Sequence, residues 1–174
     1  MDKPNYPFSA LLHAEEVRLR GLYLTMTVDL EQTLNMLIAE CFKSNKKEIK
    51  TFYQDNKGSS KDLHELTMEQ KLDVCQKGLT KYYPKEYKQY GHNFITIDKL
   101  RKVRNKFAHD KIDDYLSPND LTKLTIHKLK SNLRVSMTEY NTADLYKELF
   151  GYKDTMQDTL RLMAKVMNYP DPTF

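Results

Sequence analysis

Residues 100–110 read Leu100-Arg101-Lys102-Val103-Arg104-Asn105-Lys106-Phe107-Ala108-His109-Asp110, and this stretch carries the strongest structural signal in the chain. Apolar residues at positions 94, 97, 100 and 107 recur at three- and four-residue steps, which predicts a buried stripe on a helix over residues 94–108. Arg104 lies on that stripe, where an apolar side chain is expected. Because a guanidinium keeps its charge, a partly buried one needs a carboxylate or a phosphate as its partner.

His109 follows Arg104 by five residues. Histidine is the side chain whose unperturbed pKa permits proton transfer near neutral pH. An anchored cation together with a proton shuttle could therefore cleave RNA without a metal. On an ideal helix, however, positions five apart are separated by roughly 140° of rotation. Two arrangements would bring the side chains together: a helix that ends near Ala108, or two chains that meet across a symmetry axis. In the structural alternative, Arg104 pairs with a carboxylate such as Asp29, and His109 caps the helix end.

Two further long helices are expected before this one. After an extended arm over residues 1–8, Ser9 is a plausible N-cap of a helix that reaches about residue 43. Its expected inner face comprises Leu19, Leu22, Met26, Leu30, Leu34, Leu37 and Cys41. Polar residues over 43–61 predict a loop, and Thr67-Met68-Glu69-Gln70 fits a capping box that starts the second helix.

The run from Lys81 to Tyr90 alternates lysine with tyrosine. It could stack on single-stranded RNA, or it could be a loop between helices whose tyrosines cover the core. After a turn at 117–120, residues 124–139 carry a hairpin signal. Asn141 is expected to cap a last helical region, which Gly151 could bend or split. The sequence therefore predicts a mainly α-helical domain over residues 9–174: an antiparallel bundle of four to five helices with a small β-hairpin.

Composition narrows the classes of function. The chain has 174 residues, a net charge of +4, and no window that approaches the roughly twenty apolar residues of a membrane span. Its first residues lack the pattern of a signal peptide, so a cytoplasmic location is expected. Cys41 and Cys75 both fall in helical patterns and are expected to be core thiols. The scattered histidines and the five glycines form no metal-binding or phosphate-binding motif, so no metal and no cofactor are expected.

The segment from Arg104 to His109 resembles the signature of the HEPN superfamily: an arginine, a polar residue, and a histidine after a short spacer. A long first helix, a second helix opened by residues 67–73 and the motif in the third are similar to the mannitol-repressor-like branch of that superfamily. The resemblance covers residues 15–112 or so. It implies a HEPN-like α-helical bundle that dimerises through the motif helix.

For many members, the resemblance also implies metal-independent endoribonuclease activity. Arg104 would then bind the phosphate under attack, His109 would move the proton, and Asn105 would orient the phosphate or the histidine. The 2′-OH of the substrate would be the nucleophile, so the products would end in 2′,3′-cyclic phosphate.

Basic residues next to the motif, namely Arg101, Lys102 and Lys106, are expected to contact RNA. Two functions follow from the resemblance. The first is a homodimeric ribonuclease that serves as a toxin, with an antitoxin as partner, or as a phage-defence effector. The second is a non-catalytic dimer that serves as a regulatory or protein-interaction module, since fold does not imply function.

Overall fold

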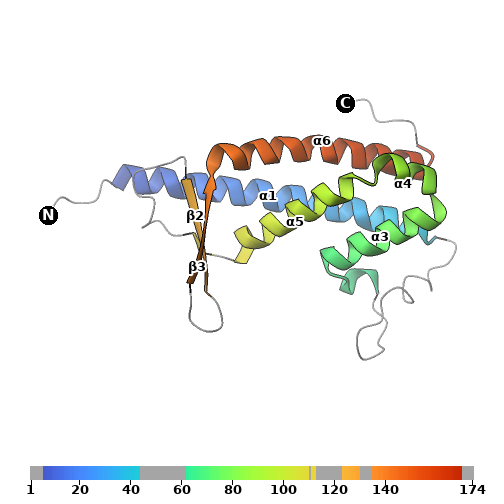
Figure 1. Cartoon of the computed structure of the whole chain (residues 1–174), viewed down its shortest axis with the longest axis horizontal. Coiled ribbons are helices and arrows are strands. Elements are labelled where there is room, and N and C mark those ends of the chain that lie inside the picture. The colour runs from blue at the N-terminus through green and yellow to red at the C-terminus, as the bar shows by residue number, and fades with distance from the viewer. Residues whose placement is uncertain (1–5, 44–61, 110, 113–122, 130–134, 170–174) are drawn as a thin grey trace. The chain divides into compact units, whose positions relative to one another are not determined.

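Helices dominate the computed structural model of the chain, which describes residues 6–43, 62–109, 111–112, 123–129 and 135–169. In chain order the elements are α1 (Tyr6–Cys41), η1 (Leu63–Glu65), α3 (Met68–Tyr82), α4 (Pro84–Tyr90), α5 (Asn93–His109), β1 (Lys111–Ile112), β2 (Lys123–Leu129), β3 (Val135–Asn141) and α6 (Thr142–Val166) (Figure 1). The prediction of a mainly α-helical bundle is confirmed. The loop expected over 43–61 and the turn expected at 117–120 fall almost wholly outside the described residues.

The chain divides into two compact units. Unit 1 comprises residues 1–26 and 102–151, and unit 2 comprises residues 27–101 and 152–174. Helices α1, α5 and α6 each contribute residues to both units. The expected division into an arm and one domain over residues 9–174 stays a prediction.

Helix α1 begins earlier than expected. Its first residue is Tyr6, so Ser9 lies inside the helix and does not cap it. Pro7 explains the early start, because its ring fixes a φ suited to a first helical turn and its missing N–H costs nothing there. Within unit 1, Tyr23 occupies the inner face of α1, whereas Leu22 is 40% exposed, which corrects the predicted stripe. The ring of Tyr23 is buried and its hydroxyl donates to the Leu145 carbonyl at 3.2 Å, so its polar end is satisfied.

The predicted hairpin is present in unit 1. Strands β2 and β3 pair antiparallel from Lys123↔Asn141 to Leu129↔Val135, and β1 pairs antiparallel with β2 to give the order β1-β2-β3. Asn141 then caps α6 as expected, since its Oδ1 accepts from the backbone nitrogen of Ala143 at 2.9 Å. Helix α6 runs unbroken through position 151, so the glycine there does not split it.

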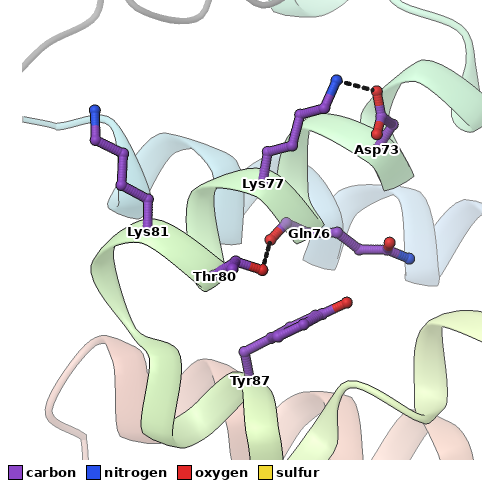
Figure 2. Close-up of a pocket in the computed structure, with 6 residues that line it drawn as sticks. All are labelled: Asp73, Gln76, Lys77, Thr80, Lys81 and Tyr87. Atoms are coloured by element: carbon purple, nitrogen blue, oxygen red, sulfur yellow. Dashed lines mark hydrogen bonds and ion pairs between the residues drawn. The ribbon is translucent and has the colours of Figure 1, made fainter.

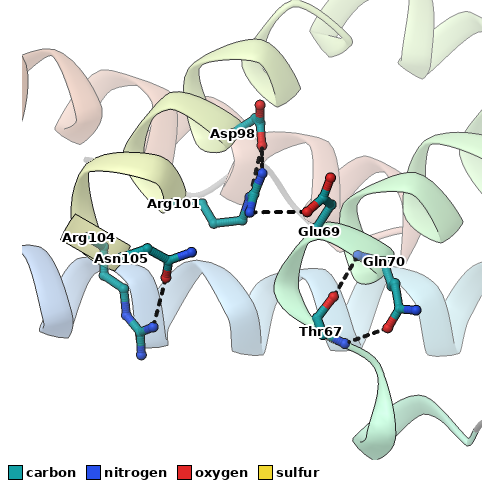
Figure 3. A network of polar contacts seen from close by, with 7 residues as sticks. All are labelled: Thr67, Glu69, Gln70, Asp98, Arg101, Arg104 and Asn105. Carbon is teal, nitrogen blue, oxygen red and sulfur yellow. Dashed lines mark hydrogen bonds and ion pairs between the residues drawn. The ribbon is translucent and has the colours of Figure 1, made fainter. Parts of the chain in front are cut away.

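Unit 2 is built from helical segments around a shared core. The capping box at the start of α3 is confirmed: Gln70 nitrogen donates to Thr67 Oγ1 at 3.3 Å, and Thr67 nitrogen donates to Gln70 Oε1 at 2.9 Å (Figure 3). Gly78 permits the close approach of α3 to the end of α1, because a Cβ at this position would lie 2.8 Å from the Phe42 ring. The core side chains come from α1 (Leu30, Leu34, Leu37, Ile38, Cys41), the turn after it (Phe42), α3 (Leu72, Val74, Cys75, Leu79), α4 (Tyr90), α5 (Phe94, Ile97, Leu100) and α6 (Leu162, Ala164, Val166).

Candidate functional site

Helix α5 positions the motif residues. Within unit 2, its residues Phe94, Ile97 and Leu100 are buried, and within unit 1 its residue Phe107 is fully buried. The predicted stripe is therefore confirmed. Arg104 lies between Leu100 and Phe107 and is half-buried, as its place on the stripe requires.

The Arg104 guanidinium has no carboxylate partner among the described residues. Its Nη1 donates to Oδ1 of Asn105 at 3.0 Å, and its Nε is buried without a hydrogen-bond partner there (Figure 3). Asp29, which the structural alternative names as partner, is exposed and belongs to unit 2, so its pairing with Arg104 stays a prediction. Most of the N–H donors of the guanidinium are therefore still available. A phosphate could accept hydrogen bonds from them and balance the positive charge.

Asn105 has a different neighbour from the ones expected. We expected its side chain to orient the phosphate or the histidine, whereas here its amide oxygen holds the Arg104 guanidinium. An amide accepts a hydrogen bond without neutralising the cation, which a carboxylate would do. Asn105 therefore fixes one edge of the guanidinium and preserves its positive charge.

His109 is the last residue of α5. The helix therefore ends one residue after the expected end near Ala108, and both arrangements that could bring His109 to Arg104 stay predictions. A helical backbone keeps positions 104 and 109 roughly 140° apart. The side chain of His109 lies outside the described residues, so its role stays a prediction.

Of the three basic residues expected to contact RNA, Arg101 is already paired. Its Nε and Nη2 donate to Oδ1 of Asp98 at 2.9 and 2.7 Å, and its Nη1 lies 3.3 Å from Oε2 of Glu69 (Figure 3). The Arg101 side chain is only 13% exposed. A phosphate would have to compete with two carboxylates for it. Lys102 and Lys106 are both exposed on α5.

Lys106 has a neighbour that the sequence analysis did not identify. Its Nζ donates to the hydroxyl of Tyr140, the next-to-last residue of β3, at 2.6 Å. The Tyr140 ring lies against the Phe107 ring, with 6.4 Å between centroids, and Phe107 stacks on Tyr23 at 5.0 Å. The signal that could have located this neighbour is the confirmed hairpin, whose second strand brings a tyrosine to α5.

The run from Lys81 to Tyr90 is not the expected loop, since residues 84–90 form α4. Pro84 starts this helix at a position where proline is favoured, and Glu86 in the first turn suits the positive end of the helix dipole. Tyr90 is buried and Tyr87 contacts the Phe94 ring, with 6.1 Å between centroids. These two tyrosines therefore cover the core, as the structural alternative for this run predicts.

A cavity of about 400 Å³ lies beside α3 and α4 in unit 2, and its lining residues are Asp73, Gln76, Lys77, Thr80, Lys81 and Tyr87 (Figure 2). Two hydrogen bonds join lining residues to one another. Lys77 donates to Asp73 at 2.7 Å, and the Thr80 hydroxyl donates to the Gln76 carbonyl at 2.7 Å. The cavity offers neither a histidine nor an activated nucleophile, so α5 remains the stronger candidate.

Two further observations concern only the described part of the chain. It holds no group of three or more histidine, cysteine, aspartate or glutamate side chains placed to bind a metal ion. None of its helices is long and apolar enough to cross a membrane.

Comparison with protein-family models, curated proteins and solved structures finds no significant match for this chain.

Proposed function

We propose that this chain is a HEPN-type, metal-independent endoribonuclease that acts as a homodimer in the cytoplasm. The observation that carries the proposal is that the positive charge of Arg104 is not neutralised by a carboxylate among the described residues. The guanidinium is half-buried and is held by Asn105 within the motif. A structural arginine at such a position normally recruits an acid, whereas a phosphate-binding arginine must keep its charge available.

The proposed reaction uses only side chains of the motif and the substrate. His109 takes the proton from the ribose 2′-OH, whose oxygen attacks the adjacent phosphorus. The bond from phosphorus to the 5′-oxygen breaks, and the same His109 returns the proton to that oxygen. Arg104 donates hydrogen bonds to the phosphate oxygens as their negative charge grows. The products are a 2′,3′-cyclic phosphate and a 5′-hydroxyl.

The geometry of α5 supports a homodimer as part of the proposal. Positions 104 and 109 face directions roughly 140° apart on a helix that continues through His109. One chain therefore does not easily direct both side chains at one phosphate. Two chains related by a two-fold axis can do so, if Arg104 of each faces His109 of the other across a shared cleft. A toxin or defence role, with an antitoxin that blocks this cleft, is the biological setting we propose.

A regulatory dimer without catalysis is the second candidate. It is favoured by Arg101, whose charge is compensated by Asp98 and Glu69 and so adds little to a basic RNA-binding surface. The net charge of +4 is also modest for a nucleic-acid-binding protein. In this case the motif would stabilise the dimer and no RNA would be cut.

Purified full-length chain, incubated with mixed RNA in excess EDTA, distinguishes the two candidates. We expect cleavage to persist, because the proposed reaction uses no metal, and to leave 2′,3′-cyclic phosphate and 5′-hydroxyl ends. DNA of the same sequence should stay intact, because it lacks the 2′-OH. A requirement for a divalent cation, or cutting of DNA, would contradict the mechanism. Failure to cut any RNA would favour the regulatory dimer.

A further inference from the structure

Tyr140 is the outermost ring of three aromatic side chains in unit 1. The rings of Tyr23 and Phe107 are buried and stack at 5.0 Å with 19° between their planes. The ring of Tyr140 follows at 6.4 Å from Phe107, tilted by 33°, and Tyr140 is partly exposed. Because buried neighbours fix its position, little further ordering is needed before this ring can receive a flat ligand.

Lys106 places a positive charge at the edge of that ring. Its ammonium donates to the Tyr140 hydroxyl at 2.6 Å and lies 5.3 Å from the ring centroid. With these two distances, the ring centroid, the hydroxyl oxygen and the ammonium lie nearly on one line. The ammonium therefore lies at the edge of the ring and leaves its faces uncovered. A phenol leaves the charge uncompensated, whereas Lys77 and Arg101 are each paired with carboxylates. Lys106 has no carboxylate partner among the described residues.

Position 106 also has a defined relation to the motif. Residues three apart share one face of an α-helix, so positions 106 and 109 lie on the same side of α5. Position 104 lies on nearly the opposite side, because two residues correspond to roughly 200°. In the proposed dimer, Lys106 and Tyr140 thus belong to the side of the cleft that supplies the histidine.

A cation beside a fixed, partly exposed aromatic ring matches the chemistry of single-stranded RNA. Every base has a π-face that can stack on an aromatic side chain, and the adjoining phosphate pairs with a basic residue. Bases inside a duplex are already stacked on one another and cannot use such a ring. We propose that Lys106 and Tyr140 form a binding site for single-stranded RNA, with a base on the Tyr140 ring and the neighbouring phosphate on the Lys106 ammonium. This inference rests on the proposed ribonuclease function.

The test measures binding without cleavage. The probe is a fluorescent single-stranded RNA of roughly twelve nucleotides, long enough for one site, in which every 2′-OH is methylated so that it cannot attack. Fluorescence anisotropy at fixed salt gives the Kd for the full-length chain. Tyr140→Phe, which keeps the ring, should bind within about twofold of wild type, whereas Tyr140→Ala should bind about 5- to 100-fold more weakly. Lys106→Ala should also weaken binding. The slope of log Kd against log salt concentration should fall by about 1, the value for one lost phosphate contact.

Controls separate binding from folding. Tyr140→Leu keeps apolar volume against Phe107 but removes the π-face, so it should bind as weakly as Tyr140→Ala while staying folded. Tyr169 is 63% exposed in unit 2, and Tyr169→Ala should leave the Kd unchanged. Wild-type affinity in folded Tyr140→Leu would overturn the inference, and so would absence of binding by wild type.

The two proposals can fail separately. If wild type binds the methylated probe through Tyr140 but cuts no ordinary RNA, the binding site stands and the ribonuclease is wrong. If wild type cuts ordinary RNA while the Tyr140 variants bind and cut normally, the ribonuclease stands and the binding site is wrong.

Discussion

Replacing His109 with alanine should lower the rate of RNA cleavage by about 10²- to 10⁴-fold, because this is the usual contribution of one general acid–base group. His109 is the histidine at motif spacing from Arg104, and it ends the helix that carries both residues. Single-turnover cleavage of a labelled RNA in EDTA measures the loss directly. The free energy of unfolding should change little, because position 109 lies at a helix end.

His92 provides the matched control. It is exposed before α5, and His92→Ala removes an imidazole from the same chain without touching the motif. Its cleavage rate should equal that of wild type. Full activity in His109→Ala, or an equal loss in His92→Ala, would contradict the role assigned to His109.

The largest loss of stability is expected for Phe107→Ala. Phe107 is fully buried, stacks on Tyr23 and contacts Tyr140, and its carbonyl accepts from Arg20 Nη1 at 2.5 Å. Removing a buried phenylalanine leaves a cavity and typically costs about 3–5 kcal/mol. Because the rings of Tyr23 and Tyr140 come from α1 and β3, the loss should loosen all three elements of unit 1.

Urea denaturation, followed by circular dichroism, measures this loss. Phe150 is a phenylalanine of the same unit that is 72% exposed on α6. Phe150→Ala should change the free energy of unfolding by no more than about 0.5 kcal/mol, as for other surface substitutions. Similar losses in the two variants would show that the stacked rings contribute no more to stability than an exposed side chain does.

Patterns that depend on local sequence predicted the fold well. The apolar spacing in α5 located its buried face, and Thr67 with Gln70 located the start of α3. The hairpin and the cap at Asn141 were also predicted, because turn chemistry and alternating residues act over short distances. Local signals of this kind are readable without knowledge of what packs against them.

Errors arose where tertiary contacts decide the outcome. Position 22 was assigned to the buried face of α1, yet Tyr23 is buried there, where its ring stacks on Phe107 and its hydroxyl donates to the Leu145 carbonyl. Lys71 is nearly buried and pairs with Glu31 on another helix at 2.5 Å, forty positions away along the chain. No spacing rule in one sequence connects two such residues.

In the candidate site, too, local features were predicted from the sequence and tertiary contacts were not. The sequence placed Arg104 on a buried stripe, and the structure confirms that place. It did not predict that Asn105 holds the guanidinium, nor that Tyr140 of β3 meets Lys106. Both contacts depend on rotamers and on the hairpin lying beside α5, which are properties of the folded chain.

The central claim is that Arg104 of one chain and His109 of another act on the same phosphate, and subunit mixing tests it most directly. Arg104→Ala and His109→Ala homodimers should each be inactive. Among the described residues, the side-chain partner of Arg104 is the Asn105 amide and not a carboxylate, so this variant should fold. After the two variants exchange subunits, about half of the dimers should be mixed, and each mixed dimer holds one complete pair of the two.

Cleavage in EDTA should therefore return to about one quarter of the wild-type rate for random pairing. Mixing Arg104→Ala with the double variant Arg104→Ala/His109→Ala should restore nothing, because no complete pair can form. A mixture of the two single variants that stays inactive, although native mass spectrometry shows mixed dimers, would contradict the shared cleft.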